Sequence, residues 1–289
     1  MSDEKASKEK VDSNAQFAVA ELATPPAVGH VKLIMKDART GEETVLVDRK
    51  NTITQNMYET LTGLLNGDNN WIDRIAFGTN GDPEAEINNT ISGAVTVPAT
   101  HSYPTAGDTS VEFTGTLDAA TANGMTIREI GLFFHSGTAL AARISFETVT
   151  KCAYFTLSVV WSITWPTPTG GALNAIRGVL ARLISSGASS ADFVTSIQFG
   201  TGSATPDPSN THLQLPVAKV DVTTAVISPT DYTARFVGYL DSFTANGYTI
   251  AEAGLLTAGG ILIARETFAG RYKDADHMLE FGITIRLHS

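Results

Sequence analysis

Residues 123–132 read NGMTIREIGL, and residues 246–255 read NGYTIAEAGL. Seven of the ten positions are identical, and the two stretches lie 123 residues apart. A second match, IAFGTN at 75–80 with IQFGTG at 197–202, has an offset of 122 residues. Nearly equal offsets indicate that the chain contains two copies of one structural unit. The repeat therefore predicts two homologous domains.

The elements of each copy follow the same order. Helices are predicted over 53–65 and 173–185, because apolar residues recur there at the spacing of an amphipathic helix. After each helix come a short strand, a proline-containing loop and several runs of alternating apolar residues. This order predicts a mainly β (α+β) fold with two tandem homologous antiparallel β-sandwich-like domains, each with one leading amphipathic helix. The expected boundaries are an N-terminal arm at 1–29, a first domain at 30–166, a linker at 167–172 and a second domain at 173–289.

Only the first copy is preceded by a predicted β-hairpin. Two β-rich runs, at 31–35 and 44–47, flank a turn that contains Gly41. The residues before this hairpin, 1–29, are small and of mixed charge, a composition that does not favour a packed core. We expect them to form an extended arm that binds a partner subunit. The residues expected to make this contact are Phe17, Val19, Leu22, Pro25 and Pro26.

A pair of opposite charges is expected inside each copy. If the first repeated strand turns back near Ser136, Glu129 lies directly opposite Arg143. The same pairing of residues across the hairpin of the second copy places Glu252 opposite Arg265. We interpret both as partly buried structural ion pairs, because a Glu held by an Arg is a poor base. With the turns they form the repeated structural motif: Gly78, Asn123, Gly124, Glu129, Gly131, Arg143, Gly200, Asn246, Gly247, Glu252, Gly254 and Arg265.

Composition limits the classes of partner. The 289-residue chain has 20 basic and 30 acidic side chains, a formal net charge of −10, and no dense basic run, which disfavours nucleic acid. One cysteine, Cys152, excludes an internal disulfide. No apolar run approaches a membrane span, and the first residues lack the apolar core of a signal peptide. We expect no nucleic-acid partner, no membrane and assembly in a cytoplasm.

The sequence contains none of the common catalytic motifs, neither a nucleophile elbow nor a zinc-protease, phosphate-loop or kinase signature. The six histidines have no ligand spacing. The FGTG run at 199–202 leads into prolines where a dinucleotide-binding loop requires a helix. An acidic loop with Asp82, Glu84 and Glu86 does not have the ligand order of an EF-hand. We expect no enzyme activity, no catalytic residue, no cofactor and no metal.

Two residue types with possible chemistry have structural alternatives. Cys152 could act as a nucleophile beside Lys151, but the second copy has no thiol at the equivalent place. The three tryptophans could stack on a sugar, yet Trp161 corresponds to Ile283 of a core-like strand. Catalysis by Cys152 is therefore disfavoured, and packing is the favoured role of the tryptophans.

The order of motifs resembles that of β-rich structural proteins of tailed bacteriophages, of the collar, neck and tail-fibre-associated type. The shared motifs are FGTN or FGTG, the proline-containing loop, NGxTIxExGL, and LxARxxF at 140–146 and 262–268. The run EIGLF at 129–133 is similar to the amino-terminal domains of tail-collar fibre proteins. The resemblance implies a non-enzymatic virion protein of the neck, collar or upper tail that assembles around the connector–tail region and anchors fibres.

The same resemblance implies other phage structural proteins as partners, a homo-oligomer with cyclic symmetry, and a place in the virion after assembly in the host cytoplasm. Two alternatives are left open. One is a capsid decoration protein, and the other is a carbohydrate-binding module with loop aromatics such as Tyr103 or Tyr232. The second copy has Leu256 where the first has Phe133, and it lacks the leading hairpin. The two copies are therefore expected to meet different neighbours.

Overall fold

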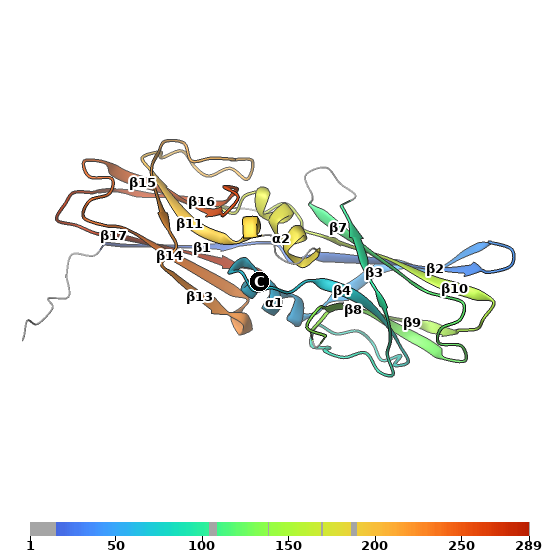
Figure 1. Ribbon diagram of the computed structural model, residues 1–289. Coiled ribbons are helices and arrows are strands. Elements are labelled where there is room, and N and C mark those ends of the chain that lie inside the picture. Colours follow the sequence, from blue (N-terminus) through green and yellow to red (C-terminus); the bar gives the residue numbers. More distant parts are fainter. Residues whose placement is uncertain (1–15, 104–108, 138, 169, 186–189, 289) are drawn as a thin grey trace, which may run out of the picture.

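The structure is a computed structural model that describes residues 16–103, 109–137, 139–168, 170–185 and 190–288. The described residues contain two α-helices and 17 strands, which confirms the predicted mainly β fold. Figure 1 shows an elongated molecule with both helices at its centre and strands extending toward both ends.

Both predicted helices are present and begin two residues later than expected. They are α1 (Gln55–Leu65) and α2 (Ala175–Ser185), and their buried faces pack against each other at the centre of the molecule. Their apolar residues belong to one continuous core that also contains residues from the strands of both repeats. The two domains are therefore fused by a shared core between the helices.

The first domain forms one large sheet, whose strands are β2 (Val28–Asp37), β3 (Glu43–Ile53), β4 (Ile72–Gly78), β5 (Val95–Pro98), β6 (Thr100–Ser102), β7 (Ser110–Leu117), β8 (Thr126–Phe134), β9 (Leu140–Thr150) and β10 (Phe155–Thr164). Their order in space is β5-β4-β8-β9-β3-β2-β10-β7-β6. The predicted hairpin is β2–β3. β3 joins the two halves of the sheet, because it pairs with β2 along most of its length but with β9 only at Thr52 and Ile53.

The second domain has two separate four-stranded sheets. One, in the order β12-β11-β15-β16, consists of β11 (Val194–Gly200), β12 (Pro216–Asp221), β15 (Thr249–Thr257) and β16 (Leu262–Tyr272). The other, in the order β1-β17-β14-β13, consists of β1 (Gln16–Ala23), β13 (Thr224–Ser228), β14 (Thr233–Leu240) and β17 (Leu279–Arg286). Short 3₁₀ helices, η1 (Ser190–Asp192) and η2 (Pro229–Asp231), precede β11 and β14. Among the residues that the structure describes, no strand equivalent to β3 joins these two sheets.

β1 corrects the prediction of a separate arm over residues 1–29. It runs parallel to β17, from Gln16 opposite Leu279 to Ala23 opposite Arg286. Leu22 is only 4% exposed and belongs to the core. Composition could not show this, because main-chain pairing accepts small and mixed-charge residues. β1 is part of the second domain's sheet, at the position that β2 occupies in the first domain.

The other residues assigned to the arm also lie along the fold. Phe17 and Val19 are in β1, and the short link that contains Pro25 and Pro26 leads from β1 into β2. β1 and β2 follow each other along the long axis of the molecule (Figure 1). The chain therefore starts its described part in the second domain, builds the first domain and then returns. Residues 1–15 of the expected arm lie outside the described residues.

Candidate functional site

Each domain holds one buried Glu–Arg pair. Arg143 Nε donates to Glu129 Oε2 at 2.8 Å, and Arg265 Nε donates to Glu252 Oε2 at 2.9 Å. All four side chains are at most 3% exposed. Both expected pairs are present, and they lie deeper than the partly buried position that the sequence suggests.

The predicted register of these pairs is wrong by two residues. Glu129 lies opposite Ser145, and Arg143 lies opposite Gly131. The hairpin turn is one residue longer than predicted, and a β-bulge beside it shifts the strands by one more residue. The second copy shows the same two additions. A shift of two keeps both side chains on one face, because side chains alternate along a strand, so Glu and Arg meet diagonally.

The first pair fastens the proline-containing loop that follows β4. Glu129 Oε1 accepts hydrogen bonds from the backbone N–H groups of Asn80 at 3.1 Å and Ser92 at 2.8 Å. The guanidinium of Arg143 donates to the carbonyl oxygen of Asp82 at 3.0 Å. One buried ion pair thus holds both ends of the loop. We call this arrangement, and its second copy, the Glu–Arg clasp.

The second pair fastens the equivalent loop after β11. Glu252 Oε1 accepts from the backbone N–H groups of Gly202 at 3.1 Å and Leu215 at 2.7 Å. Arg265 donates to the carbonyl oxygen of Ala204 at 3.1 Å. The two clasps therefore hold the two copies of the loop by equivalent hydrogen bonds.

An asparagine completes each clasp and is absent from the predicted motif. Asn88 Oδ1 accepts from Arg143 at 3.0 Å and from the backbone N–H of Ala85 at 2.7 Å. Asn210 makes the equivalent bonds in the second copy. The two asparagines are 122 residues apart, the same offset as the FGT motif. That shared offset is the signal by which the sequence could have identified them.

Gly78 and Gly200 leave room for the two buried carboxylates. A Cβ atom on Gly78 would lie 2.6 Å from Glu129 Oε1, and one on Gly200 would lie 2.5 Å from Glu252 Oε1. Both distances are too short for non-bonded atoms. Glycine is therefore required at these positions for the carboxylates to reach the loops.

The repeated Asn-Gly turns belong to a second arrangement, built on a buried lysine. Lys151 Nζ donates to Asn123 Oδ1 and to the carbonyl oxygen of Ala119, both at 3.3 Å. In the second copy, Lys273 Nζ donates to Asn246 Oδ1 at 2.8 Å. Burial lowers the pKa of both lysines. Each lysine joins the turn before the repeated strand to the turn after the following strand.

The candidate nucleophile and turn glycines have structural places in this arrangement. The carbonyl oxygen of Cys152 accepts from Lys151 Nζ at 2.8 Å, so the main chain of this residue takes part and not its thiol. Gly124 and Gly247 have φ angles of +86° and +85°, a conformation that residues with side chains rarely adopt. These glycines allow the turns to close around the lysines.

The acidic loop does not gather its carboxylates around one point. Glu84 binds Arg49 at 3.0 Å and the hydroxyl of Ser145 at 2.6 Å. Glu86 instead lies 3.7 Å from His288, near the junction of the domains. Within the described part of the chain, no group of three or more His, Cys, Asp or Glu residues is placed to hold a metal ion.

The aromatic residues considered for sugar binding make contacts within the fold. Trp161 is fully buried and donates through Nε1 to Asn51 Oδ1 at 3.0 Å. The hydroxyl groups of Tyr103 and Ser185 lie 2.6 Å apart. Tyr232 packs in an aromatic cluster with Tyr58 and His288.

The second clasp predicts a specific dependence of stability on pH. Burial alone would raise the pKa of Glu252, but hydrogen bonds from the backbone N–H groups of Leu215 and Gln214, together with Arg265, outweigh it and hold this pKa below its ordinary 4.5. A pKa that is lowered in the folded state means that the carboxylate stabilises the fold above about pH 4.5. This contribution is lost as the pH falls through the folded-state value.

We therefore expect Glu252→Gln to reduce the loss of unfolding free energy between about pH 5 and pH 3. Urea unfolding across this range measures it, with the exposed Glu43→Gln as the control that keeps the wild-type slope. An unchanged slope in the Glu252→Gln variant would show that this carboxylate does not contribute to acid sensitivity.

Comparison with models of protein families, with curated proteins and with solved structures gives no match for the chain. No described helix combines the length and apolar character needed to cross a membrane.

Proposed function

We propose that the protein is a non-enzymatic structural protein of a tailed-bacteriophage virion, located at the neck, collar or upper tail. It binds other phage structural proteins there and anchors fibres. The order of motifs in the two repeats supports this class, through its resemblance to collar, neck and tail-fibre-associated proteins. One structural observation carries the proposal: both copies use buried charged side chains to fix the shape of a surface loop.

A fixed loop suits a protein whose role is assembly. Each Glu–Arg clasp holds both ends of its loop by hydrogen bonds to a buried ion pair. A loop that is already ordered loses less conformational entropy when a partner binds. Buried charges can also specify one geometry at the expense of stability, which is the role we assign to both pairs. The two loops are therefore our candidates for contacts with neighbouring virion proteins.

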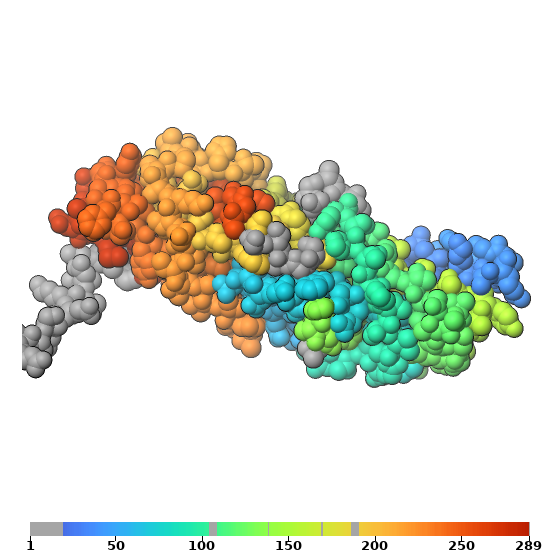
Figure 2. All heavy atoms as spheres, in the orientation of Figure 1, coloured from blue at the N-terminus to red at the C-terminus, as the bar shows by residue number. Residues whose placement is uncertain are grey.

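The shape of the molecule supports repeated assembly. Figure 2 shows an elongated surface, with the second domain at one end and the β2–β3 hairpin at the other. The two ends carry different elements, so each subunit can meet two different neighbours. When the two ends of identical subunits bind each other head-to-tail, a ring forms if the rotation from one subunit to the next closes. We therefore propose a homo-oligomer with cyclic symmetry.

Electron microscopy of labelled particles tests the location. Virions would be bound with antibody fragments raised against the purified chain and imaged in negative stain. We expect label at the neck or upper tail, arranged around the tail axis. Label spread over the head would favour a capsid decoration protein, and absence of label from all particles would overturn the virion assignment. Binding of the purified chain to a glycan array would favour the carbohydrate-binding alternative.

A further inference from the structure

The chain contains four Asn-Gly pairs, at 66–67, 80–81, 123–124 and 246–247. An asparagine that precedes a glycine is chemically labile, because no side chain on the glycine hinders attack of its backbone nitrogen on the asparagine Cγ. The new N–Cγ bond closes a succinimide ring. The Cγ–Nδ2 bond breaks, and the side-chain amide leaves as ammonia with the proton of the backbone N–H. Water then opens the ring to aspartate or isoaspartate.

In the two repeated turns, the reacting groups are held in hydrogen bonds. The N–H of Gly124 donates to the carbonyl oxygen of Lys151 at 2.8 Å, and that of Gly247 donates to the carbonyl oxygen of Lys273 at 2.8 Å. Each asparagine side chain is bonded at both ends: Oδ1 accepts from the lysine Nζ, and Nδ2 donates to backbone carbonyl oxygens. Both reacting groups must break these bonds before they can combine. The lysine turns therefore protect their asparagines.

The pair Asn80–Gly81 lies at the start of the first clasped loop and lacks this protection. Asn80 Oδ1 accepts from the N–H of Asp82 at 3.0 Å, an Asx turn that folds the carboxamide back over the intervening Gly81. Among the described residues, none accepts a hydrogen bond from the Gly81 N–H or from Asn80 Nδ2. The attacking nitrogen and the leaving amide therefore break no hydrogen bond to the described chain.

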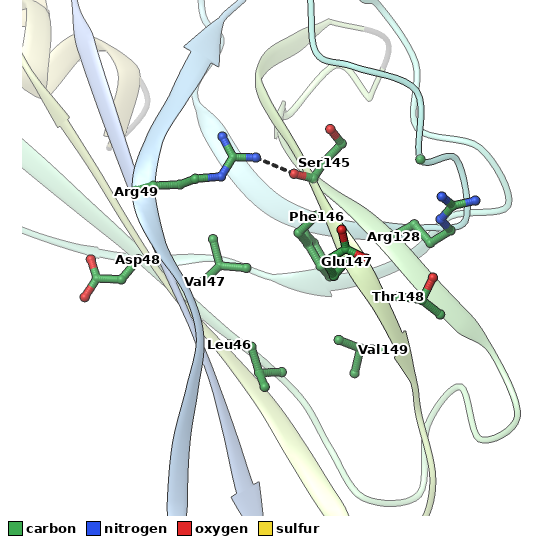
Figure 3. Close-up of a pocket in the computed structure, with 11 residues that line it drawn as sticks. Leu46, Val47, Asp48, Arg49, Arg128, Ser145, Phe146, Glu147, Thr148 and Val149 are labelled. Atoms are coloured by element: carbon green, nitrogen blue, oxygen red, sulfur yellow. Dashed lines mark hydrogen bonds between the residues drawn. The ribbon is translucent and has the colours of Figure 1, made fainter.

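Arg128 places a positive charge beside this pair. A Cβ atom on Gly81 would lie 2.4 Å from Arg128 Cζ, so the guanidinium packs directly against the glycine. Figure 3 shows Arg128 extending toward the loop that follows β4. Negative charge develops on the asparagine Oδ1 as the nitrogen attacks, and a nearby cation stabilises such charge. The surroundings of Asn80 thus favour the reaction that the lysine turns suppress.

The fourth pair, Asn66–Gly67, has one of the two protecting features. It follows the last turn of α1, where the N–H of Gly67 donates to the carbonyl oxygen of Leu64 at 3.1 Å. Within the described part of the chain, the side chain of Asn66 makes no hydrogen bond. We therefore expect Asn66 to react more slowly than Asn80 but faster than the asparagines of the lysine turns.

We propose that Asn80 is a site of spontaneous deamidation and that this reaction opens the first Glu–Arg clasp. The N–H of Asn80 donates to Glu129 Oε1 at 3.1 Å, so the modified residue is itself held by the clasp. The second copy has Gly202 at the equivalent place, 122 residues later, and cannot react in this way. Only the first loop is therefore released with age. The inference goes beyond the proposed function and does not depend on it.

Two changes in the product weaken the clasp. The new carboxylate lies near that of Glu129, and two like charges that share a site repel each other. Isoaspartate also adds one methylene group to the main chain at residue 80. This displaces the end of the loop, where the carbonyl oxygen of Asp82 accepts a hydrogen bond from Arg143.

Peptide mapping of the aged protein tests the site. The purified full chain would be stored at neutral pH and digested with pepsin at acid pH, and mass spectrometry would follow the replacement of NH₂ by OH at each asparagine. We expect Asn80 to react about tenfold faster than Asn123 and Asn246, the effect of losing the protecting hydrogen bonds. In urea, where those bonds are absent, the four pairs should react at similar rates.

Substitution of the lysine tests the protection. Lys273→Met should speed the reaction of Asn246 about tenfold and leave that of Asn80 unchanged. The comparison of the four pairs in the wild type needs no substitution, so it decides the question even if this variant does not fold. Equal rates at Asn80 and Asn246 in the folded wild type would overturn the proposed site.

Limited proteolysis tests the opening of the clasp, with Asn80→Gly as the matched control because it introduces the residue of the second copy. During storage, the loop at 79–94 should be cut progressively faster in the wild type and at a constant rate in Asn80→Gly. The loop at 201–215 should be cut at a constant rate in both proteins. Deamidation of Asn80 without faster cleavage of the first loop would overturn the opening of the clasp.

Discussion

Glu252→Ala should lower the free energy of unfolding by about 3–5 kcal/mol, as expected when one partner of a buried ion pair is removed. The substitution leaves Arg265 only 3% exposed and without its counter-ion. It also removes the acceptor for the backbone N–H groups of Gln214 and Leu215. An uncompensated buried charge and unsatisfied backbone donors each destabilise the folded state. The loop after β11 loses its attachment at the same time.

Urea unfolding of Glu252→Ala, Arg265→Ala and the double variant measures this effect. Each single change should be strongly destabilising, and the double variant should lose much less than the sum, because no buried charge is then left unpaired. The exposed pair of Lys36 and Glu43 supplies the control, and Glu43→Ala should change stability by at most about 0.5 kcal/mol. Additive losses in the double variant would contradict a coupled buried pair. Limited proteolysis should cut the loop between Gly202 and Leu215 faster in both single variants.

The clasps show how far the sequence alone predicts the site. Glu129 and Arg143 could be identified because they recur with the repeated strand. Their exact separation along the sheet could not, because a longer turn and a β-bulge depend on how the whole hairpin packs. Asn88 recurs at the repeat offset but does not stand out in the sequence, because the surrounding loop residues differ between the copies. A repeat thus predicts which side chains matter better than it predicts how the strands align.

The fold shows the same division between local and distant information. Both helices and the β2–β3 hairpin follow from apolar periodicity and turn residues close together in the chain. β1 does not, since Gln16 pairs with Leu279 at the other end of the sequence. Local sequence patterns also do not predict the separation of β3 from β9, because β-bulges on these two strands cause it. The sequence therefore does not predict contacts between distant segments that share no local pattern.

Leu22→Ala should destabilise the protein by about 2–5 kcal/mol, the range for truncating a buried leucine. Leu22 is 4% exposed and lies in the shared core, although it comes from a segment whose composition resembles that of an exposed arm. Beyond it, the N–H of Thr24 donates to the carbonyl oxygen of Arg286 at 2.9 Å. The N–H of Ala27 donates to the hydroxyl of Tyr58 on α1 at 3.1 Å. The segment therefore connects the last strand of the second domain to the helix of the first.

The neighbouring residue provides a matched control for the role of β1. Glu21 is on the same strand but exposed, and its pair with Arg286 is open to solvent, so Glu21→Ala should change the free energy of unfolding by at most about 0.5 kcal/mol. Deleting residues 1–23 should lower the midpoint of thermal unfolding well below that of a chain lacking only residues 1–15. The longer deletion removes all the main-chain pairing between β1 and β17 and uncovers core that Leu22 protects. Equal midpoints for the two deletions would mean that β1 adds nothing to the second domain's sheet, and residues 16–23 would then be available to a partner subunit.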